Sequence, residues 1–379
     1  MTSRTDSRHA LPAVLLTGSL ALTACGGASA EGAAAGGPVT VTASDTACDV
    51  SRTTFTAGRN TLDITNRGGQ TTEVYLYAEG DRIVTEKENI APGLHYELTV
   101  DVPQGSYVIA CKPGEVGDGI RVPVTVDAAA GAPTPIDPAA AQAVTAYRAY
   151  VQEQADALVP LVKRFARAVQ DGDVAKAQRL YAPSRVPWEA IEPVAEAFGD
   201  LDPRVDLREA DLEPGQEWTG WHRLEKALFA KRSTEGMDGV ARQLVTDVQD
   251  LQARVPEAEM TAASIGNGAK ELLDEVATGK VTGEEEAFSH TDLVDFAANV
   301  AGARKAFEVL RPLVERNDPA LVPTLESAFG DVEDALAPYA RGDGYVSYAR
   351  VRAPQRRELA RVVDALGEPL SQLAAAATR

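Results

Sequence analysis

The hydrophobic residues of this 379-residue chain change their spacing near residue 130, and this change most constrains the fold. Before it, apolar and polar residues alternate, as in Val39-Thr40-Val41-Thr42, with turn residues between the runs. Such alternation is typical of half-buried β-strands. After it, apolar residues recur with the spacing of helices. The sequence therefore predicts a small antiparallel β-sandwich at 38–127, an Ala/Pro/Gly-rich linker at 128–137 and an all-helical domain at 138–379.

Three short motifs mark expected helix starts. Asp137-Pro138 and Asp318-Pro319 each place a capping Asp before a first-turn Pro, and Ser289-His290-Thr291-Asp292 has the order of a capping box. We expect a long helix after each of them. A helical segment of this length predicts packed bundles.

The first residues are typical of an export signal. Arg4 and Arg8 precede an apolar run that is too short for a membrane span, and Leu-Thr-Ala-Cys25 resembles a bacterial lipobox. We expect a signal peptide at 1–24, lipidation of Cys25 and a flexible Gly/Ala-rich tether at 25–37. The rest of the chain should then lie outside the cytoplasm, anchored by lipid to the outer face of the cell membrane, in the periplasm or at the cell surface.

The net charge narrows the class of partner. At pH 7 the formal charge is -19, which argues against nucleic-acid binding and favours attraction of cations. A net acidic surface also serves plain solubility, so the charge alone does not assign a function.

His222 and Glu225 form an H-x-x-E pair within Gly-Trp-His-Arg-Leu-Glu. Three residues apart on a helix, both side chains point the same way and can hold one metal ion. The alternative is an amphipathic helix in which His222 is a hydrogen-bonded core residue. Upstream, Glu189 and Glu192 share one helix stripe, which would equally suit a solvated acidic face.

Cys48 and Cys111 are the only cysteines after Cys25. In an oxidising compartment two such cysteines most often form a disulfide, whereas thiolate ligands of a metal are the alternative. Both readings remain open from the sequence.

Five separated motifs, in order, resemble the EfeO family of iron-uptake proteins. They are Glu88-Asn89-Ile90-Ala91-Pro92-Gly93, the stretch from Arg185 to Asp206, Gly-Trp-His-Arg-Leu-Glu, Thr282-Gly283-Glu284-Glu285 and Ser289-His290-Thr291-Asp292-Leu293. The resemblance implies an N-terminal cupredoxin-like sandwich and a C-terminal imelysin-like domain built as a pair of four-helix bundles.

The resemblance also implies a function. It suggests an extracytoplasmic iron-binding lipoprotein of an EfeUOB-type transport system, which passes iron, ferrous or ferric, to a membrane permease and works with a haem-peroxidase-type partner. The residues that match the family's metal site are His222, Glu225, Glu189, Glu192 and Asp206, with Glu285 a less certain member. In the sandwich, Cys48, Glu73 and Cys111 match a second ligand set, for copper or zinc, if the two cysteines are not joined in a disulfide.

The donor chemistry agrees with iron. Carboxylates with one imidazole suit iron or manganese, and clustered carboxylates repel one another unless a cation joins them. A blue-copper site needs two His, a Cys and a weak axial ligand, but the sandwich segment contains only His95 and no Met.

Two other functions compete with iron uptake. The H-x-x-E motif has placed imelysin-like domains among peptidases. A zinc peptidase helix, however, normally carries H-E-x-x-H, and here Arg223 stands in place of the Glu and Lys226 in place of the second His. We therefore expect no enzyme activity. A structural surface lipoprotein without metal is the remaining alternative.

Overall fold

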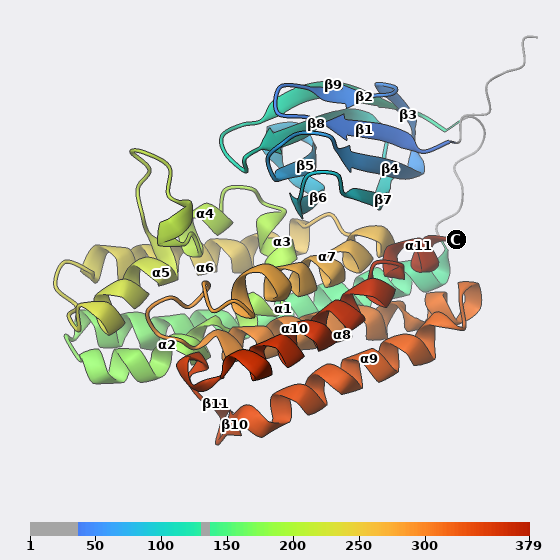
Figure 1. Ribbon diagram of the computed structural model, residues 1–379. Helices are drawn as coiled ribbons and strands as arrows, with labels where there is room; N and C mark the ends of the chain where they lie inside the picture. The colour runs from blue at the N-terminus through green and yellow to red at the C-terminus, as the bar shows by residue number, and fades with distance from the viewer. Residues whose placement is uncertain (1–36, 130–136) are drawn as a thin grey trace, which may run out of the picture. The chain divides into compact units, whose positions relative to one another are not determined.

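The computed structural model describes residues 37–129 and 137–379, which belong to one compact unit (Figure 1). The predicted signal peptide, Cys25 and nearly all of the tether lie outside the described residues, as do residues 130–136 of the linker. In the part of the chain that is described, no helix has both the length and the apolarity needed to cross a membrane.

Residues 39–127 form a sandwich of two sheets, as the alternating pattern predicts. The four-stranded sheet has the order β2-β1-β4-β7 and the five-stranded sheet the order β3-β9-β8-β5-β6. The strands are β1 (Val39–Ala43), β2 (Cys48–Val50), β3 (Thr54–Thr56), β4 (Gly58–Asn66), β5 (Thr72–Tyr77), β6 (Ile83–Ile90), β7 (His95–Val102), β8 (Gly105–Pro113) and β9 (Ile120–Asp127).

The expectation of a purely antiparallel sandwich is wrong for two strand pairs. β1 pairs with β4 in parallel, and β3 pairs with β9 in parallel. The chain leaves the first sheet after β2, contributes β3 to the second sheet and returns as β4. Alternation within a strand reports which face is buried and not the direction of its neighbour, so the sequence pattern could not reveal this crossing.

The two faces of β5 have different neighbours. Val74 and Leu76 point into the sandwich core, whereas Tyr75 and Tyr77 stack on the outer face with ring centroids 5.2 Å apart. The outer face of this sheet therefore carries phenol groups rather than a plain polar surface.

The chain beyond the linker is helical. Its α-helices are α1 (Pro138–Gln170), α2 (Val174–Glu189), α3 (Glu192–Glu196), α4 (Asp202–Val205), α5 (Gly220–Glu225), α6 (Asp238–Arg254), α7 (Ala262–Glu275), α8 (Asp292–Asn317), α9 (Leu321–Leu336), α10 (Ala353–Leu370) and α11 (Leu373–Thr378). π-Helical turns follow α5 at Lys226–Ala230 and α7 at Val276–Lys280. Two short strands, β10 (Ala340–Arg341) and β11 (Gly344–Tyr345), pair after α9.

A long helix follows each of the three motifs, as expected, but only the first motif caps its helix in the expected way. Asp137 caps α1 and accepts a hydrogen bond from the Ala139 N–H, as expected. α9 begins at Leu321, because the chain first makes a turn after Asp318. The proposed capping box does not form at α8, whose cap residue Thr291 makes no capping bond. Ser289 instead hydrogen-bonds Glu286, so its hydroxyl serves the loop before the helix.

The helices share one continuous apolar core, which includes Tyr147 on α1 and Leu373 on α11. α1 packs against α2, α6 and α8, and α8 also packs against α7, α9 and α11. Helix α7 in turn contacts the sandwich: Asn267 donates to the Thr99 carbonyl at 2.9 Å, and Lys87 Nζ lies 2.8 Å from Asp274 Oδ2. α7 thus connects the helical core to strands β6 and β7.

Candidate metal centre

His222 and Glu225 lie on α5 and face each other. Nδ1 of His222 is 3.3 Å from Oε2 of Glu225, and both side chains are buried. The other oxygen of Glu225 accepts the backbone N–H groups of Phe288 and Ser289, at 2.8 and 2.7 Å. Glu225 therefore ties α5 to the loop before α8 and fixes one side of the imidazole ring.

Gly220 allows α5 to begin against α4. Its φ is +75°, and a Cβ atom there would lie 2.1 Å from the Val205 carbonyl oxygen. This close approach brings Asp206, the residue after α4, beside His222. Nε2 of His222 is 3.2 Å from Asp206 Oδ1 and 3.7 Å from Glu285 Oε1.

Nε2 of His222 has an unusual environment. It is buried within ion-pair distance of two carboxylates, yet it makes no aligned hydrogen bond with any described residue. A buried nitrogen that faces carboxylates without a hydrogen bond is what a metal-ligating imidazole offers.

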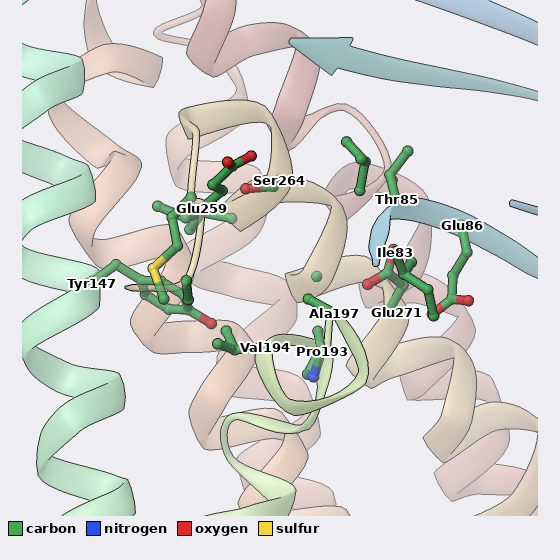
Figure 2. Close-up of a pocket in the computed structure, with 15 residues that line it drawn as sticks. Ile83, Thr85, Glu86, Tyr147, Pro193, Val194, Ala197, Glu259, Ser264 and Glu271 are labelled. Carbon is green, nitrogen blue, oxygen red and sulfur yellow. The ribbon is translucent and has the colours of Figure 1, made fainter. Parts of the chain in front are cut away.

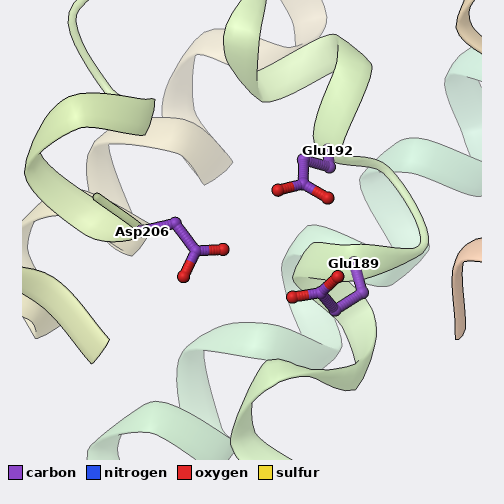
Figure 3. Close-up of side chains that lie close together, drawn as sticks. All are labelled: Glu189, Glu192 and Asp206. Carbon is purple, nitrogen blue, oxygen red and sulfur yellow. The ribbon is translucent and has the colours of Figure 1, made fainter. Parts of the chain in front are cut away.

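Three carboxylates from successive short elements converge beside His222. Figure 3 shows Glu189 at the end of α2, Glu192 at the start of α3 and Asp206 after α4. One oxygen of each lies within 4.8 Å of the others, which is close enough for a single cation to bind all three. Asn299 on α8 holds the turn between the first two by donating to the Glu189 carbonyl at 2.9 Å.

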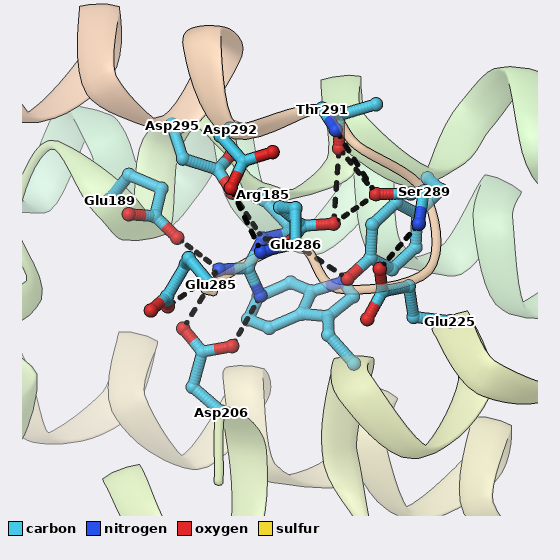
Figure 4. Close-up of polar contacts among 12 residues, drawn as sticks. Arg185, Glu189, Asp206, Glu225, Glu285, Glu286, Ser289, Thr291, Asp292 and Asp295 are labelled. Carbon is cyan, nitrogen blue, oxygen red and sulfur yellow. Dashed lines mark hydrogen bonds and ion pairs between the residues drawn. The ribbon is translucent and has the colours of Figure 1, made fainter. Parts of the chain in front are cut away.

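Arg185 lies inside this acidic cluster and is fully buried (Figure 4). Its guanidinium pairs with Glu189 and Asp206, and its Nε lies 3.0 Å from Glu286 Oε1 and 3.1 Å from Asp295 Oδ2. A guanidinium with five donors in a planar fork suits such a ring of carboxylates. Arg185 therefore joins α2 to α8 and to the loop before it.

Lys280, at the end of the second π-helical turn, is a second buried cation. Its Nζ lies 2.9 Å from Glu275, 3.0 Å from Glu189 and 3.6 Å from Glu192. Around the site, eight acidic residues surround Arg185 and Lys280. The acidic residues named here are Glu189, Glu192, Asp206, Glu225, Glu275, Glu285, Glu286 and Asp295.

The pKa values in the cluster diverge. Burial lowers the pKa of His222, but the carboxylates of Asp206, Glu225 and Glu285 together raise it by more, so it lies well above its usual value. Burial raises the pKa of Glu285, but Lys280, His222 and Arg208 lower it by more, so it lies well below its usual value. Burial also raises the pKa of Glu286 to about 7. At neutral pH a metal ion would therefore displace a proton from His222.

The cluster opens onto a cavity of about 380 Å³. Among its described lining residues, seven glutamates and three aspartates face a single arginine, Arg208. The sandwich contributes three of these acids, and the rest come from the helical part: Glu73, Glu88, Glu115, Glu192, Asp202, Asp206, Asp211, Glu275, Glu284 and Glu285. A cavity wall of one charge sign raises the local concentration of cations.

A second, smaller cavity has a different character (Figure 2). It measures about 50 Å³ and is lined by apolar groups such as Ile83, Tyr147 and Val194, with Glu86 and Glu271 at one side. Burial raises the pKa of Glu271 to about 8 and that of Glu86 well above its usual value. Burial raises the pKa of Glu192, in the proposed metal site, in the same direction.

The three residues singled out in the sandwich do not form one set of metal ligands. Cys48 and Cys111 are joined by a disulfide, with sulfur atoms 2.04 Å apart, inside the sandwich core. Glu73 precedes Val74 on β5, and Val74 is the strand partner of Cys111. Successive side chains on a strand point to opposite faces, so Glu73 lies on the outer face, where Tyr75 donates to it at 3.1 Å. Glu73 thus faces the acidic cavity and not the cysteines.

The six residues proposed for the helical-domain site are neighbours but not one ligand shell: only Glu189, Glu192 and Asp206 each offer an oxygen within 4.8 Å of the others, and His222 contacts Asp206, Glu225 and Glu285. The sequence reasoning missed the two cations. Arg185 stands four residues before Glu189, and this i, i+4 spacing is the one local signal that could have suggested the pair. No local signal connects Lys280 with Glu189, because 91 residues separate them in the printed sequence.

Comparisons with known proteins identify the family. Residues 143–373 match the imelysin family, which is also named peptidase M75. The iron uptake system component EfeO of Escherichia coli K12 and that of Shigella flexneri are each 39% identical over 341 residues, covering 88% of this chain and 90% of theirs. A candidate iron-regulated protein A precursor from Parabacteroides distasonis has a similar fold, with a TM-score of 0.50 at 15% identity, and covers 64% of this chain and 97% of that one.

The family model spans more than half of this chain, and the EfeO relatives extend through the sandwich as well. The similarity to iron-uptake relatives therefore covers both the helical part and the strands before it. This chain belongs to the imelysin family and is an EfeO-type member of it.

Proposed function

We propose that this protein captures iron outside the cytoplasm and delivers it to a membrane permease, as a lipid-anchored component of an EfeUOB-type system with a haem-peroxidase-type partner. One observation carries the proposal: His222 contacts Asp206, Glu225 and Glu285, and Asp206 and Glu285 also line an acid-rich cavity together with Glu192. The proposed ligands are His222, Glu225, Glu189, Glu192, Asp206 and Glu285.

The donor set favours iron over softer metals. Carboxylate oxygens with one imidazole suit ferrous, ferric or manganous ions, whereas copper(I) and structural zinc prefer thiolates. The cysteines of the sandwich are joined to each other, and neither belongs to this cluster. Iron is the substrate in this proposal and not a resident cofactor.

We propose that the sandwich is cupredoxin-like in fold and that the helices form the family's pair of four-helix bundles. In this proposal the sandwich contributes acidic side chains to the cavity beside the site. Glu73, Glu88 and Glu115 complete the acidic wall of the cavity, through which a cation would reach Asp206 and Glu285. A copper or zinc site at Cys48, Glu73 and Cys111 would need reduction of the disulfide and a different orientation of Glu73.

A peptidase function has less support. Hydrolysis at a metal needs an open coordination position and a free general base beside the bound water. Glu225 already accepts two backbone N–H groups, and Lys280 and Arg185 pair with the nearby carboxylates. These contacts favour binding of an ion over activation of water.

Equilibrium titration of the purified protein tests the proposal. Calorimetry with Fe²⁺ under nitrogen, and separately with ferric citrate, should show saturable binding of one iron ion in the helical domain, and a peptide library incubated with the zinc-loaded protein should stay intact. Zinc-dependent cleavage would favour the peptidase instead. If the protein binds neither iron species and cleaves no peptide, the result would favour a structural surface lipoprotein without metal.

A further inference from the structure

Lys280 pairs with two of the three carboxylates that a bound metal ion could share. Its Nζ contacts Oε2 of Glu189 at 3.0 Å and Oε2 of Glu192 at 3.6 Å. These two residues and Asp206 are the carboxylates that can share one cation. The lysine side chain is only 1% exposed, so its charge is not screened by solvent.

Two cations cannot share these carboxylates at low cost. An ammonium about 3 Å from a carboxylate already neutralises much of its charge, and an ion that arrives at the same carboxylate meets strong repulsion from the ammonium inside the protein. Either the lysine moves when the metal binds, or the metal binds to fewer carboxylates.

The side chain of Lys280 can change its position more easily than that of Arg185. Arg185 is held by four acidic residues that surround a planar group, whereas the ammonium of Lys280 sits at the end of a flexible four-carbon chain. The third partner of Lys280 is Glu275, at 2.9 Å, which lines the cavity and is 21% exposed. The ammonium can therefore leave Glu189 and Glu192 and keep its bond to Glu275.

We propose that Lys280 is a tethered counter-ion that occupies the metal-binding carboxylates and is displaced by the incoming iron. This inference rests on the proposed iron site and adds a residue that sets its affinity. The lysine keeps Glu189 and Glu192 paired before the ion arrives. When it returns to them, it helps expel the ion, as a protein that must pass its iron onward requires.

The test compares Lys280→Met with Lys270→Met. Lys270 lies on the preceding helix, pairs with Asp274 and touches none of the proposed ligands, so it controls for the loss of one positive charge. Fe²⁺ under nitrogen and Mn²⁺ are titrated into each purified protein, and thermal unfolding is followed with and without Mn²⁺. Lys280→Met should bind both ions at least about tenfold more tightly than the wild type. Without metal, its melting temperature should be lower than that of Lys270→Met. Mn²⁺ should raise the melting temperature of Lys280→Met by more than that of Lys270→Met.

Other results would overturn the proposal in distinguishable ways. If the wild type binds iron and Lys280→Met binds it equally or more weakly, Lys280 is only a structural ion-pair partner. If neither protein binds Fe²⁺ or Mn²⁺, the iron site itself is refuted and the lysine's role falls with it.

A structural measurement covers the case in which Lys280→Met does not fold. In a crystal structure of the wild type soaked with Mn²⁺, Nζ of Lys280 should lie beyond ion-pair distance of Glu189 and Glu192 while it still contacts Glu275. A lysine that remains within 4 Å of all three carboxylates beside the bound ion would refute displacement.

Discussion

Arg185 and Glu189 lie one helical turn apart on α2, and their ion pair is fully buried. At a helix surface such an i, i+4 pair contributes about 0.3–0.5 kcal/mol. In the interior, the loss of one partner costs more stability, because it leaves the other charge without water and without a counter-ion.

We therefore expect Arg185→Met to lower the free energy of unfolding by about 3–5 kcal/mol. Four acidic residues, Glu189, Asp206, Glu286 and Asp295, would lose their shared cation. Urea denaturation followed by circular dichroism measures the change. Arg179→Met, at an exposed position of the same helix, is the matched control. Equal stability of the two variants would show that the cluster protonates at little cost when its arginine is removed.

His222→Ala should weaken iron binding by at least about tenfold and leave the fold intact. The ring supplies the only imidazole of the proposed ligand set, whereas α5 is held by buried Trp221 and Leu224. His95→Ala is the control, because His95 lies on the sandwich, is half exposed and pairs with Asp63. Isothermal titration with Fe²⁺ distinguishes the two variants. An unchanged dissociation constant in His222→Ala would remove this residue from the site.

Gly220→Ala should disturb the site through the backbone. The added Cβ would meet the Val205 carbonyl at 2.1 Å, so α4 and α5 must move apart and carry Asp206 away from His222. We expect a loss of about 2–4 kcal/mol in stability, together with weaker iron binding. Gly239→Ala in α6, where nothing lies within 4 Å, should instead be neutral or stabilise by up to about 1 kcal/mol. Similar melting temperatures for both variants would contradict the close approach.

Reduction of the disulfide should destabilise the sandwich. Cys48 and Cys111 are 63 residues apart, and closing a loop of that length in the unfolded chain is worth about 4 kcal/mol in the chain-entropy account. Native protein should show no free thiol with Ellman's reagent, and dithiothreitol should lower the urea midpoint of the sandwich. Two reactive thiols in the native, air-exposed protein would contradict the pairing.

The stability of the unit should depend on pH through Glu271. Burial raises its folded-state pKa to about 8, above the ordinary value of 4.5. The folded state therefore binds a proton more tightly than the unfolded state, and stability falls as pH rises from about 4.5 to about 8. Glu271→Gln should match the wild type near pH 4.5 and exceed it by about 1–3 kcal/mol at pH 9.

Denaturation midpoints of both proteins at several pH values measure this difference. Glu153→Gln, at an exposed position on α1, should show no such trend. A constant difference between Glu271→Gln and the wild type across the pH range would mean that the pKa of Glu271 is the same in the folded and unfolded states.

The sequence predicted the fold where the pattern is local. Alternation in Val39–Ala43 and helical spacing from Pro138 reflect which side chains of a single element are buried, and both predictions are confirmed. β6 does not show this pattern, because Thr85-Glu86-Lys87-Glu88 interrupts the alternation. Glu86 is nevertheless buried, since this edge of the sheet packs against α7 and not against solvent.

The candidate site was predictable in its acids and not in its cations. A motif in order along the chain, such as His222 with Glu225, can be matched without knowledge of the fold. Arg185 and Lys280 look like ordinary charged residues in the sequence, because burial of a charge depends on contacts between distant segments. The sequence therefore suggested carboxylates without counter-ions, whereas the structure pairs them with a guanidinium and an ammonium.

The π-helical turn at Val276–Lys280 has a consequence for how the site is encoded. A π turn contains about one residue more than an α turn, and each residue of an α-helix rotates the next by about 100°. The extra residue is accommodated within one turn, so Lys280 has nearly the direction that it would have on an α-helix one residue shorter. A related chain that lacks one residue here could therefore still direct its lysine toward the residue that matches Glu189.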